Sequence, residues 1–411
     1  MNLNESQNWT VIQLGAREHY AIARALHRSG NLHQLVTDLW VPQDARWKLL
    51  RGAKAKKLAG RYSDELQQST VRAFNHQSLL FELSHRVFAQ PQWQLIEQRN
   101  EWFQHQVLQK IKGTLNENSI VFVYSYAARR ILEYCRQVGC KTILGQIDPG
   151  LFEEQLVQKS IAKHPAFENS FEQAPDSYWE NWKTECQLAD VIAVNSHWSR
   201  EALEETGIES EKIQVLPLAF EPGDDGQPAL PAKRKYPAAF TASRPLQVLF
   251  LGQAIVRKGI HLLLDSAKAL ENMPIHFTIV GNLNGLEKLF DRPNITAVGN
   301  RPRDEVQKYY RSADVFLFPT LSDGFGLTQL EARHWKLPMV CSRNCAEVVE
   351  HDENGWLLES ATEKCVTEVL VNLLQSPTTL RRWSEHLSHQ RFDLEQLSRK
   401  LTQLELQTAH A

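Results

Sequence analysis

The stretch "PTLSDGFGLTQLEARHWKLPMV", Pro319 to Val340, lies between the apolar run "ADVFLF" and a second short apolar run. Both runs have the length of buried strands, and "LTQLEARHW" has the spacing of a helix. "PTLSDGFG" is therefore expected to be the loop at the carboxyl end of the first strand. Asp323 stands in this loop and Glu331 follows eight positions later. The stretch predicts a strand, loop, helix and strand of a parallel α/β fold, with two acids at one sheet edge.

The loop also has features that suit a ligand. Gly324 and Gly326 allow the backbone to come close to another molecule. The first amides of the helix, at Leu327 and Thr328, carry partial positive charge and suit a phosphate. Since carboxylates accept hydrogen bonds from hydroxyl pairs, the whole arrangement indicates a phosphorylated molecule with sugars at both ends. A plain strand-to-helix turn, with an Asp near the helix start and a surface Glu, is the alternative.

The rest of the second half continues this βα rhythm. Its other strand candidates are "LQVLFLG" (246–252), "IHFTIVG" (275–281) and "NITAVGN" (294–300), with helical patterns at 259–270 and 303–313. Gly252 ends the first of these strands. In the loop that follows, Arg257 and Lys258 are adjacent cations at the same sheet edge, suited to neutralising a pyrophosphate. A solvated basic turn is the alternative.

The first half shows the same rhythm. "TVIQL" (10–14) ends at Gly15, a helical pattern follows to Gly30, and "HQLVTDLWV" resumes as a strand, which together form a βαβ unit. In the helical pattern, Tyr20, Ala23, Leu26 and His27 share one face. Further strand candidates are 119–125, 141–147, 190–196 and 213–219, and the region 63–118 is predicted to be mostly helical.

A connector separates the two halves. Residues 221–245 hold five prolines, two glycines and no periodic pattern. We therefore expect two Rossmann-like parallel-sheet domains that face each other across a cleft. The expected divisions are a first domain (1–220), the linker (221–245), a second domain (246–385) and a C-terminal helical segment (386–411) that can pack back on the first domain.

Bulk composition excludes several classes of protein. The 411 residues carry a formal net charge of −2, so no overall positive field recruits nucleic acid. The six cysteines form no C-x-x-C pair, which favours free thiols in a reducing compartment. The N-terminal sequence has no signal-peptide pattern, and no apolar run reaches the roughly 18 residues of a membrane span. A cytoplasmic protein is expected, at most peripheral on the inner membrane surface.

Taken together, these segments resemble the retaining nucleotide-sugar glycosyltransferases of family 4, the glycosyl transferases group 1, which have the GT-B fold. The resemblance rests on an ordered set spanning roughly residues 247–360: "GQAIVRKGIHLLLDSA", "IVGN", "VGNRPRDEVQKYYRSADVFLFPTLSDGFGLTQLEARHWKLPMV" and "EVVEHDENGWLL". The first half matches more loosely, through the Gly15 turn, "ADVIAVNSHWSREAL" and "KIQVLPLAF".

The resemblance implies that residues 1–220 form an acceptor-side domain and residues 246–385 a nucleotide-sugar-binding domain, and it implies a role for each matching residue. Arg257 and Lys258 would bind the donor pyrophosphate, and the acid-x7-acid motif falls on Asp323 and Glu331, which would hold donor-sugar and ribose hydroxyls. The remaining donor contacts would come from Gly15, Gly252, Arg301, Gly324, Phe325, Gly326, Leu327 and Thr328, with Gly15 near the distal phosphate and the loop 299–303 beside the base.

Three departures from the family pattern concern the site itself. The first acid of the motif is Asp323, one methylene shorter than the usual Glu. The first loop, "GAREHY", lacks the usual paired glycines. In place of a histidine after "TILGQI", the nearest polar residue is Asp148, which either contacts donor sugar or acceptor or is a turn residue before Pro149. His19, one turn into the first predicted helix, is either a further candidate or a helix-surface or core histidine.

The implied function is metal-independent transfer of a sugar, with retention, from a nucleotide diphosphate sugar to a hydroxyl in cell-surface polysaccharide or glycolipid synthesis. No bound cofactor is expected. The acidic pair in "GDDG" (223–226) is not interpreted as a metal site, because it lies in the linker. A non-catalytic GT-B-like protein that binds a nucleotide sugar or glycan is the alternative.

The expected acceptor is a glycan or a lipid-linked molecule. Residues 46–62 hold seven cations and no acid, which fits either an anionic membrane surface or a solvated loop.

Overall fold

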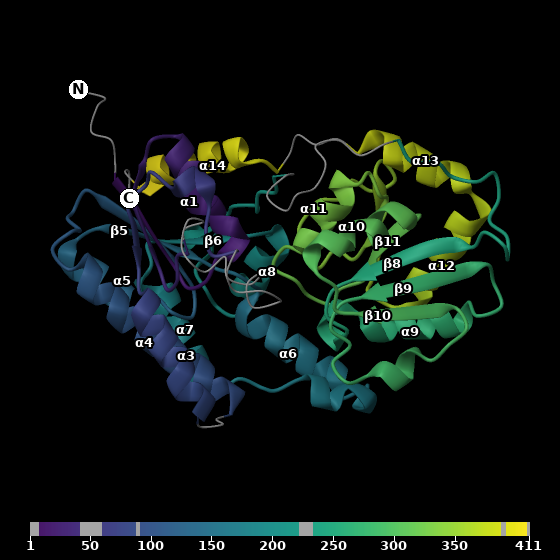
Figure 1. Cartoon of the computed structure of the whole chain (residues 1–411), viewed down its shortest axis with the longest axis horizontal. Helices are drawn as coiled ribbons and strands as arrows, with labels where there is room; N and C mark the ends of the chain where they lie inside the picture. The colour runs from purple at the N-terminus through teal and green to yellow at the C-terminus, as the bar shows by residue number, and fades with distance from the viewer. Residues whose placement is uncertain (1–7, 42–59, 88–90, 222–232, 388–391, 409–411) are drawn as a thin grey trace.

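The computed structural model describes residues 8–41, 60–87, 91–221, 233–387 and 392–408. The described chain forms two halves side by side, each a sheet covered by helices (Figure 1). The segment 46–62, predicted as a membrane-contact candidate, lies outside the described residues except for its last three positions.

The first half is built on a parallel sheet of strand order β3-β2-β1-β4-β5-β6-β7. Its central strand β4 is buried at all six positions because helices cover both faces, which explains why the sequence "SIVFVY" has no polar alternation. The strands are β1 (Asn8–Gln13), β2 (Leu32–Thr37), β3 (Val71–Ala73), β4 (Ser119–Tyr124), β5 (Lys141–Gly145), β6 (Val191–Val194) and β7 (Ile213–Val215).

Helices connect these strands. The α-helices are α1 (Ala21–Arg28), α3 (Asn75–Val87), α4 (Gln92–Ile111), α5 (Arg129–Val138), α6 (Gly150–Ile161), α7 (Asp176–Leu188) and α8 (His197–Glu205). Short 3₁₀ turns are η1 (Arg17–Tyr20), η3 (Asp64–Leu66), η4 (Pro165–Ser170) and η5 (Ser210–Lys212). The strand β3 was not predicted: it lies within the region expected to be mostly helical, at the edge of the described sheet, where it pairs with β2.

The second half has a parallel sheet of order β10-β9-β8-β11-β12-β13. Its strands are β8 (Leu246–Leu251), β9 (Ile275–Val280), β10 (Ile295–Gly299), β11 (Val315–Phe318), β12 (Met339–Cys341) and β13 (Gly355–Leu357). Its helical elements are η6 (Val256–Lys258), α9 (Ile260–Ala269), η7 (Glu287–Phe290), α10 (Arg303–Ser312), α11 (Leu327–His334), α12 (Glu363–Gln375) and α13 (Pro377–His386).

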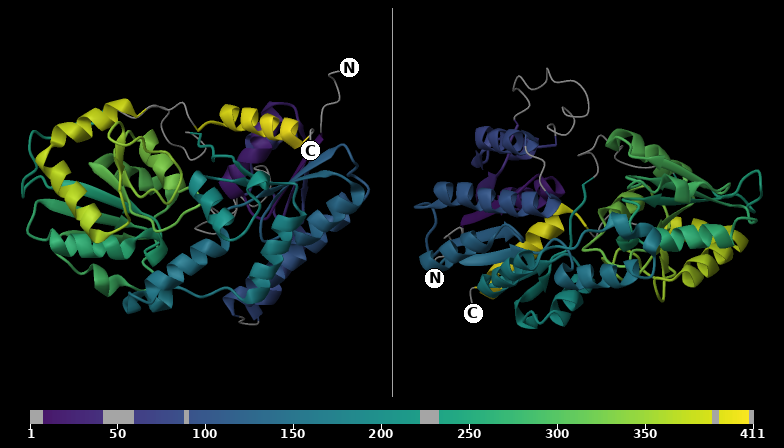
Figure 2. Two further views of the ribbon diagram at one scale, coloured as in Figure 1. Left: turned by 180° about the vertical axis from the view of Figure 1, so that it is seen from behind. Right: turned by 90° about the horizontal axis from the view of Figure 1, so that it is seen from below.

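The last helix, α14 (Leu394–Thr408), returns to the first half. Figures 1 and 2 show it beside α1, away from α12 and α13, which are similar in colour. Its leucines at 394, 397, 401 and 404 join the same buried cluster as Trp9, Val11 and Ile22 of the first half. The apolar stripe of α14 is thus satisfied by a domain distant in the sequence.

The two halves also share a core. Val157 and Ile161 of α6 and Phe167 of η4 pack in the buried cluster that contains Phe250 and Phe277 of the second sheet. The segment from α6 to η4 therefore belongs to the first sheet by chain order and to the second half by packing.

The first helix differs from its prediction. Glu18, His19 and Tyr20 have φ values of 51°, 50° and 62°, so the chain passes through the left-handed region before α1 begins at Ala21. His19 is consequently in the turn that precedes the helix, not one turn inside it. Tyr20, buried against Trp40, also lies outside the helix whose face it was predicted to share.

Candidate active site

The glycine loop after β11 is held by both halves of the protein. Gly326 has φ +83°, and a Cβ there would lie 2.7 Å from the Phe318 ring. Gly324 has ordinary φ, but a Cβ on it would lie 2.5 Å from the carbonyl oxygen of Ile147, which follows β5 in the first half. The close approach that requires glycine at 324 is therefore to the facing domain's backbone.

Arg257 and Lys258 lie next to this loop because β8 and β11 are neighbours in the sheet. The carbonyl oxygen of Arg257 accepts from the amide of Leu321 at 2.8 Å and from the hydroxyl of Thr320 at 2.9 Å. Gly259 has φ +75°, and a Cβ there would lie 2.1 Å from the carbonyl oxygen of Pro319. The loops after β8 and β11 thus form one tightly packed unit.

A buried charge cluster lies where these loops meet. Lys258 forms an ion pair with Asp323, and Nη1 of Arg257 lies 3.9 Å from Oδ1 of Asp323. Asp323 is 9% exposed. Burial opposes its ionisation, yet the charges of Lys258 and Arg257 hold its pKa below the usual value. Burial lowers the pKa of Lys258, and the Asp323 carboxylate opposes that shift.

Asp148 meets this cluster from the first half. Its Oδ1 accepts hydrogen bonds from the Tyr126 hydroxyl and, at 3.0 Å, from the amide of Gly150, the first residue of α6. Asp148 is thus fixed in the turn before α6, and its charge also acts on Arg257. The structure brings Asp148, Arg257, Lys258 and Asp323 together.

Glu153, in the first turn of α6, belongs to the same cluster and was not predicted. Its Oε1 lies 3.5 Å from Nε of Arg257. Burial raises its pKa to about 7; Arg257 opposes this shift, while Asp148 and Asp323 add to it. The available signal was its position three residues beyond the end of the "QIDPG" turn, at the carboxyl edge of the first sheet.

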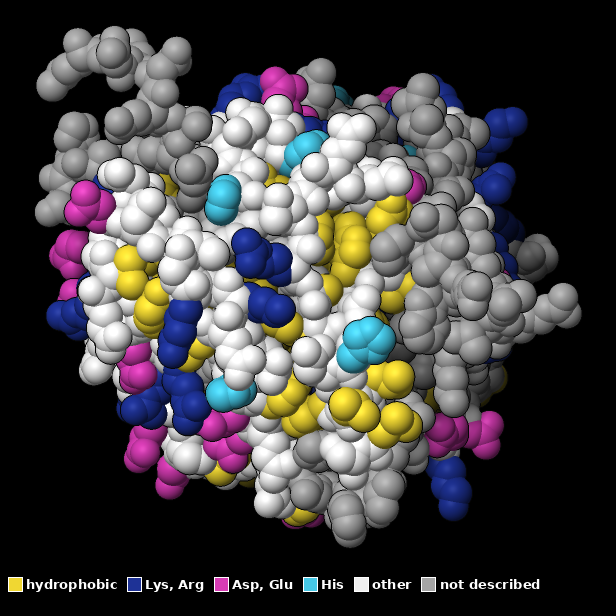
Figure 3. All heavy atoms as spheres, turned by 60° about the vertical axis from the view of Figure 1, so that its left-hand side comes forward, with side chains coloured by type: hydrophobic (Ala, Val, Ile, Leu, Met, Phe, Trp, Pro, Cys, Tyr) yellow, Lys and Arg dark blue, Asp and Glu magenta, His cyan; other side chains and the backbone are white. Residues whose placement is uncertain are grey.

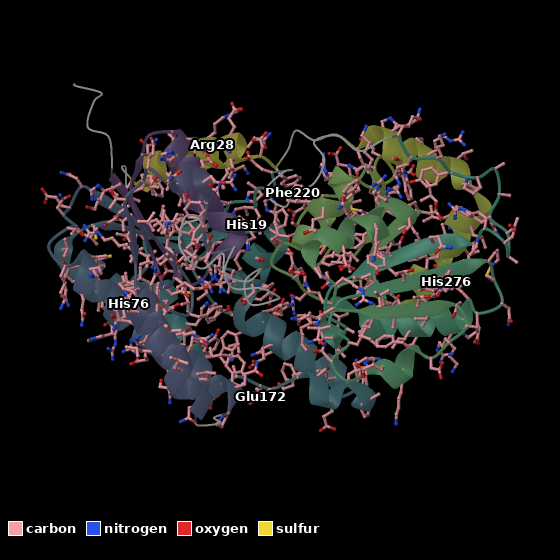
Figure 4. All side chains as sticks on the ribbon, in the orientation of Figure 1. His19, Arg28, His76, Glu172, Phe220 and His276 are labelled. Atoms are coloured by element: carbon pink, nitrogen blue, oxygen red, sulfur yellow. The ribbon has the colours of Figure 1, made fainter. Side chains whose placement is uncertain are left out.

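Glu331 lies about one turn into α11, which begins at Leu327. Its Oε2 accepts a 2.7 Å hydrogen bond from the Tyr310 hydroxyl. Glu331 and Leu327 line a small pocket with Glu18 and His19 from the first half. Figure 4 shows His19 and Phe220 at the junction of the two halves and His276 away from it. The pocket brings His19 to the Glu331 side of the junction.

The other predicted donor-site residues are more dispersed. The amide of Gly15, at φ +88°, donates to Oδ1 of Asp38 at 2.8 Å, so this amide is already occupied. Gly252 directly follows β8, and a Cβ on Gly281 would lie 1.9 Å from the carbonyl oxygen of Gly252. Arg301 is exposed beyond β10 and donates to the carbonyl oxygen of Asn300. Phe325 is buried, at 2% exposure.

Direct hydrogen bonds close the junction beside the glycine loop. Nε1 of Trp198 donates to Oγ of Ser322 at 3.0 Å, and Oγ of Ser199 donates to the carbonyl oxygen of Gly324 at 3.3 Å. Both donors lie on α8 of the first half. The loop that carries Asp323 is therefore positioned by the first half as well as by its own sheet.

Three properties of the described residues bear on membranes, metals and surface charge. No described helix is both long and apolar enough to cross a membrane. Within the same ranges, no group of three or more His, Cys, Asp or Glu side chains is placed to hold a metal ion. On the face in Figure 3, basic and acidic side chains are interspersed with histidine and hydrophobic ones.

Comparison with known families gives a match within the second half. Residues 245–376 match the family described as Glycosyl transferases group 1. This part of the chain is therefore similar to the group 1 glycosyl transferases, in agreement with the sequence resemblance. The match covers the charge cluster's Arg257, Lys258 and Asp323 and the acid at Glu331.

Curated relatives match about half of the chain. The chain is 25% identical over 199 residues to an uncharacterized 41.2 kDa protein in the cps region of Klebsiella pneumoniae, covering 48% of this chain and 54% of that protein. It is 23% identical over 202 residues to the amylovoran biosynthesis glycosyltransferase AmsK of Erwinia amylovora, covering 45% and 47%. The chain thus spans about half the length of these relatives.

Solved structures match nearly the whole chain. Sucrose-phosphate synthase from Thermosynechococcus elongatus superposes with a TM-score of 0.65 at 17% identity, covering 98% of this chain and 99% of that one. Anabaena HepE in complex with UDP and glucose superposes with a TM-score of 0.61 at 13% identity, covering 98% and 100%. The two facing parallel-sheet domains are the GT-B fold, which confirms the predicted fold class.

Proposed function

We propose that the protein is a glycosyltransferase that moves a sugar from a nucleotide diphosphate sugar to an acceptor hydroxyl. The observation that carries the proposal is the convergence of Arg257, Lys258 and Asp323 beside the start of α11, with Asp148 facing them from the other half. The group 1 domain and the GT-B fold support the same conclusion.

The cations would stabilise the leaving group. When the bond between the anomeric carbon and the diphosphate breaks, negative charge develops on the diphosphate oxygen. Arg257, Lys258 and the first amides of α11 are preorganised donors, and such groups each contribute roughly 3 kcal/mol to a transition state. Asp323, which pairs with Lys258 here, would accept hydrogen bonds from donor-sugar hydroxyls. Glu331 would hold the ribose hydroxyls.

Retention is part of the proposal. The acceptor oxygen would bond to the anomeric carbon on the face that the diphosphate leaves, while the hydroxyl proton leaves toward the diphosphate oxygen. The protein would contribute electrostatic stabilisation and positioning, without a bound metal. The relatives AmsK and the capsular polysaccharide biosynthesis glycosyltransferase CapM of Staphylococcus aureus support a role in cell-surface polysaccharide synthesis.

The donor is found by thermal stabilisation. UDP-, GDP- and ADP-sugars are added separately to the purified protein, and the true donor is expected to raise its Tm in a concentration-dependent manner. Slow hydrolysis of that donor, measured as release of the nucleoside diphosphate, distinguishes a transferase from a protein that only binds the donor. A donor that stays intact after prolonged incubation would favour the alternative of a non-catalytic protein that only binds it.

Lys258→Ala tests the charge cluster. Because Lys258 would neutralise the leaving diphosphate, the substitution is expected to lower kcat for donor turnover by roughly 100-fold or more, with the far-UV CD spectrum unchanged. The matched control is Lys364→Ala, a lysine of the same domain whose side chain is 79% exposed. Donor turnover by Lys258→Ala within threefold of the control would contradict the proposal.

A further inference from the structure

A second cavity adjoins the charge cluster. It has a volume of about 210 Å³ and lies between α4, α6 and α7 of the first half and η6 of the second half. Arg257, Asp148 and Glu153 of the charge cluster are among the residues that line it. Glu172 also lines it, and Figure 4 shows this residue at the lower edge of the molecule, between the two halves. The cavity therefore adjoins both the charge cluster and, at Glu172, the edge of the molecule.

Aromatic rings form one side of the cavity. Tyr126 and Tyr178 are stacked, with centroids 4.8 Å apart and an interplanar angle of 15°, and Trp93 meets Tyr178 edge to face at 4.9 Å. Hydrogen bonds fix the two indoles: Trp93 donates to the carbonyl oxygen of Glu172 at 3.1 Å and Trp179 donates to Glu154 at 2.8 Å. Such fixed aromatic surfaces suit the C–H faces of sugar rings.

The charges of the cavity select against an anionic ligand. The residues that line it include four acids, Asp148, Glu153, Glu154 and Glu172. Among the described residues that line it, Arg257 is the one cation, and it is already close to Glu153 and Asp323. A phosphate placed here would meet net negative charge, whereas hydroxyl groups would meet hydrogen-bond acceptors.

One acceptor atom lacks a partner. Oε2 of Glu153 is buried and has no hydrogen bond of normal geometry among the described residues, although Oε1 lies 3.5 Å from Arg257 and a hydrogen bond from the Ser322 hydroxyl lowers the pKa of the Glu153 carboxyl. Buried polar atoms are usually paired, so an unpaired carboxylate oxygen beside a cavity indicates a donor that is brought by a ligand. Asp148, by contrast, already accepts from Tyr126 and Gly150.

We propose that this cavity binds the acceptor as an uncharged sugar unit, with its ring against Trp93 and Tyr178 and one hydroxyl donating to Oε2 of Glu153. The inference rests on the proposed transferase function and assigns it a substrate class. Glycans whose reactive unit carries a phosphate would be excluded from the cavity by its carboxylates. Trp93 and Glu153 are acceptor-binding residues in this assignment.

Binding is tested first, without turnover. Saturation-transfer NMR uses octyl glucoside, octyl galactoside and octyl mannoside, each below its micelle concentration, with myo-inositol 1-phosphate as the anionic comparison. At least one glycoside is expected to receive saturation at its ring protons, and Trp93→Ala is expected to reduce that signal at least fivefold. Trp93→Phe, which keeps an aromatic ring, is expected to restore most of it.

Transfer is tested next, with the donor found by thermal stabilisation. Trp93→Ala and Glu153→Leu, which removes the acceptor oxygens, are each expected to raise KM for the glycoside at least tenfold, while the donor still raises their Tm. The control Glu82→Leu, whose side chain is 51% exposed on α3, is expected to match the parent. Unchanged KM in both cavity variants, or preferred binding of the inositol phosphate, would overturn the assignment.

The two failures are distinguishable. If no sugar nucleotide stabilises the protein or is turned over, the transferase function fails, and the NMR result decides separately whether the cavity binds uncharged sugars. If donor turnover is normal but no glycoside contacts the cavity, the transferase function stands and the acceptor assignment is wrong.

Discussion

At the scale of single residues, Glu153 links the charge state of the site to pH. Its folded-state pKa is about 7, raised by burial above the ordinary 4.5, with Arg257 opposing the shift. Below pH 7 the carboxyl is largely protonated and does not compete for the Arg257 charge. Above pH 7 it ionises, and a bound diphosphate would then have to share Arg257 with a second anion.

UDP-glucose measures this effect because its diphosphate, esterified at both ends, does not titrate near pH 7. If it is a donor, its affinity is expected to fall roughly three- to tenfold between pH 6 and pH 8 at constant ionic strength. Glu153→Gln is expected to flatten that dependence. Equal slopes in the parent and in Glu153→Gln, measured by calorimetry, would remove Glu153 as the cause.

At the scale of elements, α7 holds the start of α5. The carboxylate of Glu185 accepts from the amides of Tyr126 at 2.6 Å, Ala128 at 2.7 Å and Arg129 at 3.1 Å. These amides precede or begin α5, so they have no partner within that helix. Glu185 thus fixes the turn that carries Tyr126, and with it one wall of the cavity.

Replacing Glu185 tests this contact. Glu185→Ala leaves buried amides without an acceptor and is expected to lower the free energy of unfolding by about 2–4 kcal/mol in urea titrations. Burial raises the pKa of Glu185 to about 7, partly offset by the bonds from those amides. The stability that the protein gains from protonated Glu185 is therefore fully present below the unfolded-state pKa near 4.5, and it is lost as the pH rises through 7.

Glu185→Gln serves as the matched variant because its amide oxygen still accepts hydrogen bonds. It is expected to be destabilised less than Glu185→Ala at pH 7 and to lose the decline in stability between pH 4.5 and pH 7. A decline of the same size in both the parent and Glu185→Gln would show that another group causes it.

At the scale of the whole molecule, the C-terminal helix α14 packs against the first half of the chain. Leu401 of α14 is fully buried against the first half, whereas the neighbouring Gln403 is exposed. Leu401→Ala is expected to cost about 2–5 kcal/mol in urea unfolding, since it opens a cavity in that core. Gln403→Ala is expected to stay within about 0.5 kcal/mol of the parent.

Equal unfolding midpoints for Leu401→Ala and Gln403→Ala would show that α14 is not part of the folded core. The same pair of variants also tests whether α14 supports the site. Because α14 packs on α1 and not on the charge cluster, donor-induced stabilisation is expected to persist in Leu401→Ala below its own melting temperature.

The sequence by itself determined the parallel α/β architecture and the neighbourhood of Arg257, Lys258 and Asp323. Continuous apolar runs specify buried parallel strands, and the carboxyl ends of such strands share one edge, so the loops after 246–251 and 315–318 had to meet. Two acidic positions eight apart, and the order of the motifs, completed the resemblance.

Tertiary structure alone decided what faces that edge. Glu153 reaches Arg257, and Gly324 reaches the carbonyl of Ile147, because the two halves pack in one particular orientation. The left-handed turn at His19 and the short edge strand Val71–Ala73 likewise depend on neighbours distant in the sequence. Local propensity specifies elements, whereas the orientation between them arises from packing across many separated contacts, which no single stretch encodes.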